Sequence, residues 1–240
     1  FVQQAMGKGN IKWNEQKPVE LNLQLTGIQG VSNQIDSAQI VLVGDASDHQ
    51  RDLTTIGQSS SVNLSIQGQL NQTSWQGNWL SGDIESSYAN LTLLKSFEIE
   101  ADWAKQQYFI APHCWGHADN ELCIKLAEFK QNTLAWDVSL KEFDVLSLVR
   151  RLMPGMPPIQ TKSRLNLDMS GDWDIKQLPN ANLNASLSPG DWVFSEQNNL
   201  KLTLDETLVK AQITQKNIRA NINLSGNKVG TLSASVEGQS

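Results

Sequence analysis

The chain of 240 residues is poor in several residue types on which catalysis and disulfide-rich scaffolds depend. It has only three histidines, and it contains no Gly-x-Ser-x-Gly, phosphate-binding-loop or dinucleotide-binding motif. Its carboxylates are scattered, so no acid–base pair stands out. Two cysteines are too few for a disulfide-dense scaffold. We therefore expect no enzymatic activity, no cofactor and no metal centre.

The chain also lacks long apolar runs and an excess of positive charge. No stretch of 18 apolar residues occurs, so we expect no membrane-spanning helix within it. A net charge of −6 is unfavourable for nucleic-acid binding, because phosphates require a basic surface. The charge is also too small to predict disorder. We interpret the chain as a piece of a longer protein.

What the sequence does have is strict alternation of apolar and polar residues. Every odd residue from Val19 to Leu25 is apolar, and the same period recurs along the chain. A period of two places apolar side chains on one face of a strand and polar side chains on the other. Such strands are typical of antiparallel sheets. We predict an all-β protein, an elongated and curled antiparallel sheet with an apolar interior that forms an open groove.

The apolar positions of these strands are the candidate groove residues. An interior of this kind needs no charged side chains, and the alternating segments supply Leu, Ile, Val and Ala. The candidates are Leu21, Leu23, Leu25, Val62, Leu64, Ile66, Leu165, Leu167, Met169, Leu183, Leu187, Leu200, Leu202, Leu204, Ile218, Ile222, Leu224, Leu232 and Val236.

Many of the alternating segments end in glycine. The glycines of this repeated strand ending are Gly27, Gly68, Gly171, Gly226 and Gly238. Glycine adopts positive φ without steric cost, as tight turns often require. We therefore expect these residues at turns or strand ends.

One segment departs from the alternation. Residues 144–153 have apolar residues at helical spacing, Asp144 as a candidate N-cap and Pro154 just beyond the end. We predict one short helix near 144–153. Residues 1–240 are then one continuous β segment, which a cysteine-bearing hairpin and this helix interrupt at about 111–160.

The side chains that could bind a metal or form a disulfide cluster at His113, Cys114, His117 and Cys123. Two imidazoles and two thiolates can bind zinc, but His113 and Cys114 would point in opposite directions on a strand. A disulfide that pins a hairpin, a metal site and unpaired thiols all remain open, and we favour the disulfide between Cys114 and Cys123.

Several of these residues carry a resemblance to a known family. The order of motifs resembles that of the TamB family, most closely over residues 70–175. The matching segments are Trp75–Leu80, His113–Trp115, Glu121–Cys123, Phe143–Val145, Leu152–Pro154 and the strand that ends at Gly171.

The resemblance implies a taco-shaped, AsmA-like β structure in the periplasm of a Gram-negative bacterium. The full-length protein would be anchored in the inner membrane, with this chain as a middle segment. It would contact a TamA-like outer-membrane protein through a region outside this segment. The groove would hold phospholipid acyl chains, and the oxidising compartment would support the Cys114–Cys123 disulfide.

Three functions follow from these observations. The first is a conduit for phospholipid between the two membranes. The second is a scaffold that assists outer-membrane β-barrel and autotransporter assembly by pairing a strand edge with an incoming strand. The third is a β-sandwich adhesin or glycan-binding module with a closed core.

Overall fold

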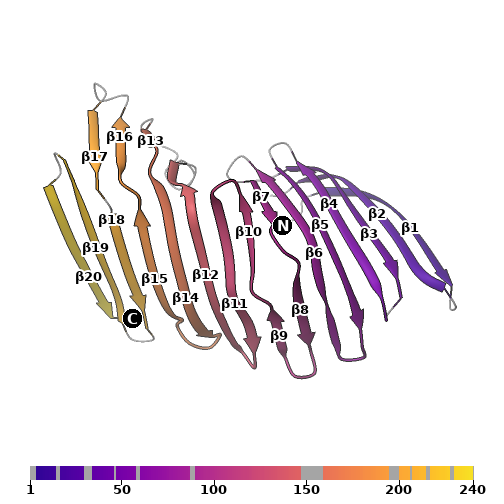
Figure 1. Ribbon diagram of the computed structural model, residues 1–240. Coiled ribbons are helices and arrows are strands. Elements are labelled where there is room, and N and C mark those ends of the chain that lie inside the picture. The colour runs from indigo at the N-terminus through magenta and orange to yellow at the C-terminus, as the bar shows by residue number, and fades with distance from the viewer. Residues whose placement is uncertain are drawn as a thin grey trace. The chain divides into compact units, whose positions relative to one another are not determined.

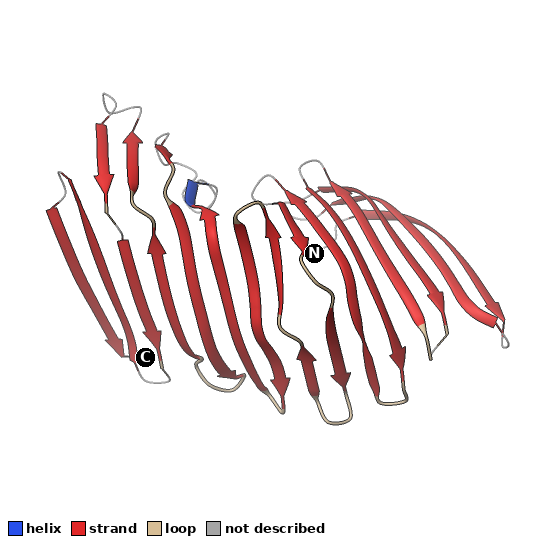
Figure 2. Ribbon diagram, in the orientation of Figure 1, coloured by secondary structure: helices blue, strands red, loops and turns tan. Residues whose placement is uncertain are grey.

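The computed structural model describes most of the chain, and Figures 1 and 2 draw the other residues in grey. The described residues are 4–14, 17–29, 34–45, 47–57, 60–86, 90–146, 159–194, 200–205, 207–214, 217–227 and 230–239. The chain divides into two compact units, residues 1–117 with 128–131 and residues 118–127 with 132–240. No helix in the described ranges is long and apolar enough to cross a membrane.

The first unit is an antiparallel sheet in which each strand from β1 to β6 pairs with the next. β6 then pairs with β7 and β8, β8 with β9, and β7 with β10. The sheet is curled, because its strands swing round steadily from β6 to β1 (Figure 1). The strands are β1 (Gln4–Asn14), β2 (Lys17–Gln29), β3 (Gln34–Gly44), β4 (His49–Gly57), β5 (Ser60–Leu70), β6 (Ser74–Ser86), β7 (Asn90–Leu93), β8 (Phe97–Asp102), β9 (Gln107–Ile110) and β10 (His113–His117).

The second unit is also an antiparallel sheet. β12 pairs with β14, followed by β15, β18, β19 and β20 in that order. A shorter line of strands, β13, β16 and β17, continues this sheet and joins it at β19. The strands are β12 (Thr133–Asp144), β13 (Ile159–Thr161), β14 (Arg164–Asp174), β15 (Asn180–Leu187), β16 (Gly190–Phe194), β17 (Leu200–Leu204), β18 (Thr207–Ile213), β19 (Asn217–Asn227) and β20 (Gly230–Gln239); β11 (Asn120–Lys130) contributes to both units.

Alternating apolar residues therefore form strands almost throughout the described chain, and the predicted all-β, antiparallel fold class is confirmed. The short segment of helix that the structure describes, residues 145–146, follows β12 (Figure 2). The side chain of Asp144 accepts a hydrogen bond from the Leu146 N–H at 3.0 Å, as an N-cap does. The rest of the predicted helix, 147–153, lies outside the described residues.

Few hydrophobic side chains are buried in this fold. Among the described residues, the buried hydrophobic side chains are Ala38, Leu93, Phe97, Trp115, Val145 and Ile159. A domain whose sheet is packed against a second layer buries far more apolar side chains than these. One face of the sheet in each unit is therefore apolar without being a closed core.

Two bulges keep the apolar residues on one face where the period of two breaks. In β6 the register shifts so that both Trp79 and Gly82 face the apolar side, with Leu80 between them. In β12 the register shifts between Leu140 and Phe143, and Glu142 there has φ of 55°. The Asn166 side chain accepts a hydrogen bond from the displaced Glu142 N–H at 2.9 Å. Each bulge thus repairs the pattern instead of interrupting the sheet.

The expectation that glycines end strands at turns is correct only in part. All five lie inside strands, within the last four residues, and only Gly27 has positive φ, 63°. At Gly68 the reason is steric, because an ideal Cβ there would overlap the Trp75 indole, and at Gly171 one would overlap Trp136. At both positions glycine makes room for the indole of a residue on the neighbouring strand.

We predict that Gly68→Ala lowers the free energy of unfolding by about 1–3 kcal/mol, because the methyl group must displace the Trp75 ring or the strand. Urea denaturation of the purified protein measures the change. Gly238→Ala is the matched control, since a Cβ there meets nothing within 4 Å. Equal effects of the two substitutions would contradict the steric role of Gly68.

Candidate functional site

The apolar face of the second unit is continuous across its strands. Strand register places Leu140, Leu167, Ala185, Val209, Ile222 and Ala234 in one row. The next row contains Val138, Met169, Leu183, Ala211, Ala220 and Val236. No described residue in these rows is charged, so the face offers an unbroken apolar track across six strands.

The first unit has a corresponding track. One row contains Leu23, Ile40, Leu53, Leu64 and Gly82, and a second contains Leu25, Ala38, Thr55, Val62 and Ile84. The Trp115 ring lies over Gly82, where an ideal Cβ would overlap it. Mostly aliphatic side chains therefore line the face from β2 to β5, and an indole covers it at β6.

The predicted groove residues thus fall on the apolar face of one or the other unit. None of them is buried: most are half-buried, and the exposed ones are Leu200, Ile218, Ile222, Leu232 and Val236. Leu200, Leu202 and Leu204 lie on β17, where Leu204 contacts the position of Gly226 on the same face. The described parts of the chain leave this face accessible to a ligand.

One charged side chain interrupts the track of the first unit, contrary to the expectation of a charge-free interior. Arg51 lies in register between Leu42 on β3 and Ile66 on β5, and its side chain is exposed. The sequence pattern does not reveal this position, because an arginine among alternating apolar residues reads only as a break in the alternation. It places one guanidinium beside half-buried aliphatic side chains.

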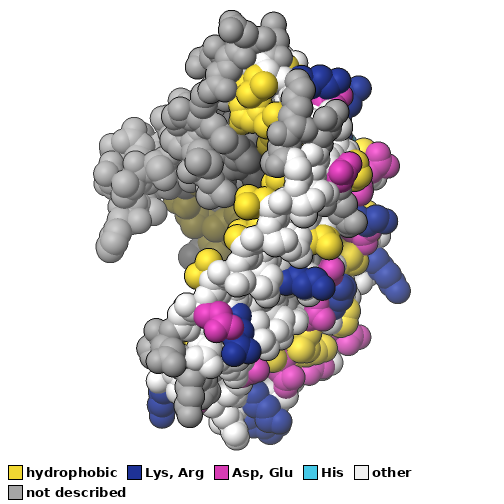
Figure 3. Space-filling model, turned by 90° about the vertical axis from the view of Figure 1, so that its left-hand side faces the viewer, with side chains coloured by type: hydrophobic (Ala, Val, Ile, Leu, Met, Phe, Trp, Pro, Cys, Tyr) yellow, Lys and Arg dark blue, Asp and Glu magenta, His cyan; other side chains and the backbone are white. Residues whose placement is uncertain are grey.

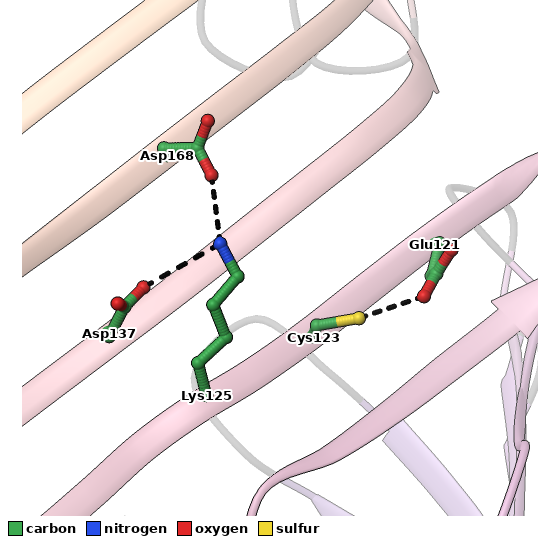
Figure 4. Close-up of polar contacts among 5 residues, drawn as sticks. All are labelled: Glu121, Cys123, Lys125, Asp137 and Asp168. Carbon is green, nitrogen blue, oxygen red and sulfur yellow. Dashed lines mark hydrogen bonds and ion pairs between the residues drawn. The ribbon is translucent and has the colours of Figure 1, made fainter.

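The opposite face of the sheet is polar. Seen from the β20 end, most of the visible charged side chains gather along one side (Figure 3). In the second unit, Lys125 Nζ lies 3.2 Å from Asp168 Oδ1 and 3.9 Å from Asp137 Oδ1 (Figure 4). These groups are exposed, so their ion pairs contribute little to stability. These ion pairs identify the solvent-exposed face of the sheet in the second unit.

The first unit contains an aromatic cluster on its apolar face. Phe97 and His113 stack with ring centroids 3.6 Å apart, and Trp79 contacts both Phe97 and Trp115, at 5.5 and 5.9 Å. Phe97, His113 and Trp115 are each less than 10% exposed. His113 Nδ1 lies 2.8 Å from the Ala111 carbonyl oxygen, to which its N–H donates. The cluster forms a local core on the apolar face.

A second indole is held by histidine. Trp75 Nε1–H donates to His49 Nε2 at 2.9 Å, and His49 Nδ1 lies 3.1 Å from the Asp45 carbonyl oxygen. An imidazole that accepts at Nε2 must carry its proton on Nδ1, which defines the tautomer. The indole is thereby fixed over Gly68 and Gly77. In the sequence, the feature that corresponds to this contact is the pair Gly68 and Gly77, which lie against the Trp75 ring.

The cysteines form the predicted disulfide. Cys114 and Cys123 are bonded to each other, which joins β10 to β11. Glu121 Oε1 lies 2.9 Å from Cys123 Sγ (Figure 4). His113 stacks in the aromatic cluster while its neighbour Cys114 is disulfide-bonded, so the structure does not bring the two histidines and two cysteines together as ligands. Because successive side chains of a strand point to opposite faces, His113 and Trp115 pack in the aromatic cluster while Cys114 between them forms the disulfide.

Burial lowers the pKa of His113 below its usual value of 6.5, against a smaller opposing effect of its hydrogen bond to the Ala111 carbonyl. The unfolded chain therefore takes up this proton first as the pH falls. The stabilisation that neutral His113 provides is complete at pH values above the pKa of this residue in the unfolded chain. It is lost as the pH falls from that value to the lower pKa of His113 in the folded state. We expect the free energy of unfolding to fall between about pH 7 and pH 5, and to fall less in His113→Phe. Identical pH profiles from urea titrations would refute this cause.

Reduction of the disulfide should lower the free energy of unfolding by about 2–3 kcal/mol, because the bridge closes a loop of roughly ten residues in the unfolded chain. Urea denaturation with and without reductant measures this. A Cys114→Ala/Cys123→Ala variant is the control, since reductant should not affect it. Complete alkylation of both thiols without reductant would show that the native protein lacks the bridge.

Comparison with known proteins identifies the family. A family model described as the N-terminal domain of TamB matches residues 2–239. No solved structure matches the chain. TamB proteins belong to a transport and assembly module of the Gram-negative envelope and are not a family of enzymes. The position of this chain in the middle of its protein stays a prediction. Because the match covers nearly all of the sequence, the chain belongs to the TamB family.

Proposed function

We propose that the apolar face of this chain carries phospholipid acyl chains between the inner and outer membranes, as part of outer-membrane biogenesis in the periplasm. The protein performs no chemical reaction on the lipid. The full-length protein is anchored in the inner membrane, and it contacts a TamA-like outer-membrane protein through a region outside this chain.

The observation that carries the proposal is the continuous apolar face, which the described residues leave uncovered. In the second unit the rows through Leu167 and Met169 cross six strands without a charge. Each methylene group that an acyl chain buries there contributes about 0.8 kcal/mol. An unbroken track can therefore hold a chain at any point along it, without specific contacts and without a fixed stopping place.

Arg51 favours an amphiphile over a plain hydrocarbon. Its exposed guanidinium lies on the apolar face of the first unit, beside Leu42 and Ile66. A guanidinium pairs readily with phosphate oxygens. An acyl chain on the neighbouring aliphatic row would bring an anionic headgroup within the reach of this side chain.

The second candidate function is the assembly scaffold. The described side chains of β20 from Gly230 to Gly238 are all exposed, and Leu232 and Val236 are 55% and 61% exposed. Exposed aliphatic side chains of this kind suit contact with an incoming β-strand of a client. The closed sandwich is disfavoured because so few hydrophobic side chains of the described chain are buried.

The test compares neighbouring residues on opposite faces of β15. Leu183→Arg puts a charge on the track, whereas Asn184→Arg puts the same charge in water, between Asp168 and Lys210 in register. We expect Leu183→Arg in the intact protein to abolish lipid copurification and phospholipid transfer between donor and acceptor vesicles, because an unpaired charge in an apolar site costs several kcal/mol. Asn184→Arg should keep both activities.

Native mass spectrometry counts the bound lipid, and circular dichroism confirms that both variants fold. Equal lipid occupancy in the two variants, or none in the unmodified protein, would rule out the conduit. Retained occupancy combined with loss of β-barrel assembly would favour the scaffold.

A further inference from the structure

A small polar patch lies within the apolar face of the second unit. It consists of Thr161, Ser163, Trp192 and Thr207, which we call the polar patch. Thr161 is in register with Trp192, which in turn is in register with Leu202. Two residues further along, Ser163 lies against Gly190, where an ideal Cβ would overlap its hydroxyl.

Thr207 completes the patch. It is in register with Leu187, which is in register with Leu165. Leu187 ends β15 and Thr207 begins β18, whereas the rungs through Gly190 and Trp192 belong to β16 and β17, which continue the same two stretches of chain. Aliphatic residues thus surround the patch on the apolar face.

Two members of the patch, Trp192 and Thr207, each have a buried polar atom without a hydrogen-bond partner among the residues that the structure describes. Ser163 and Thr207 are 1% and 5% exposed. Thr161 and Ser163 satisfy each other, since the Thr161 hydroxyl donates to Ser163 Oγ at 3.2 Å and accepts from the Ser163 N–H at 3.1 Å. Within the described parts of the chain, the Trp192 indole Nε1–H and the Thr207 Oγ1 have no partner.

Unpartnered buried donors are costly and uncommon in folded proteins, and a missing ligand or water often explains them. The chemistry of the patch limits the ligand. Its donors are neutral, and the neighbouring Lys162 and Arg164 are exposed at intervening positions of the alternation. Neutral donors suit a neutral acceptor such as an ester carbonyl, whereas a phosphate would require a cation.

We infer that the polar patch binds the ester carbonyl oxygens of a diacyl lipid, with Trp192 Nε1–H and the Thr207 hydroxyl as donors. This inference rests on the proposed lipid function and adds a subsite to it. The acyl chains lie on the aliphatic rows beside the patch, and the carbonyl oxygens occupy the positions that the two donors leave unfilled. The subsite distinguishes ester-linked lipids from hydrocarbons of the same length.

The experiment compares two phosphatidylcholines that differ only in the linkage of their chains. The diester has the carbonyl oxygens, and the diether has the same headgroup and chains without them. Binding to the intact protein is measured by titration with each lipid in detergent. We expect the unmodified protein to prefer the diester by at least about fivefold, which corresponds to one hydrogen bond.

Two conservative substitutions remove the donors, and one serves as a control. Thr207→Val and Trp192→Phe should each weaken diester binding by about fivefold and leave diether binding unchanged. Thr203→Val is the matched control, because the Thr203 hydroxyl donates to Asp191 at 2.7 Å on the polar side of β17. It should keep the preference for the diester.

A second measurement keeps the inference testable if a variant folds poorly. The carbonyl stretch of a ¹³C-labelled diester should move to lower frequency on binding to the unmodified protein. Thr207→Val should also raise the melting temperature of the lipid-free protein, because it removes an unpartnered buried hydroxyl. A threonine whose hydroxyl is hydrogen-bonded in the lipid-free protein would give the opposite sign.

The outcomes separate this inference from the proposed function. Equal binding of diester and diether overturns the subsite but leaves the apolar track in place. Binding of neither lipid overturns the proposed function, and the subsite with it. A diester preference that survives both Thr207→Val and Trp192→Phe shows that other groups recognise the linkage, which also overturns the assignment.

Discussion

The separation of apolar and polar side chains onto opposite faces of a single layer is the constraint on which this structure depends. A shift of one residue in the register of a strand would move its apolar side chains to the polar face. The rows through Leu167 and Leu183 exist because each pair of neighbouring strands keeps the same phase. Even the bulges at Leu80 and Glu142 serve this end, since each restores the phase after an extra residue.

A single layer has few places to build a rigid core, and the aromatic residues supply them. Trp115 covers Gly82, Trp75 covers Gly68, and Phe97 stacks on His113. These contacts concentrate buried surface at a few points of the first unit and leave the aliphatic rows free. The disulfide adds a covalent tie at the same hairpin, Cys114 being next to both His113 and Trp115.

The sequence was sufficient for the fold class, the two faces and the disulfide, because each depends on local pattern or on a pair of nearby residues. It was insufficient where distant residues meet. Gly171 looked like a strand end because a sequence does not reveal that the Trp136 ring occupies its missing side chain. Arg51 and Thr207 gave no signal, because their importance arises only from the aliphatic neighbours that strand register brings beside them.

The half-buried state of the apolar rows has a thermodynamic consequence. The heat capacity change of unfolding is set mainly by the apolar surface that unfolding newly exposes. In this protein much of that surface, for example at Leu232 and Val236, already contacts solvent in the folded state. The stability curve should therefore be flatter with temperature than that of a globular domain of equal length, and its curvature should increase when a ligand covers the rows.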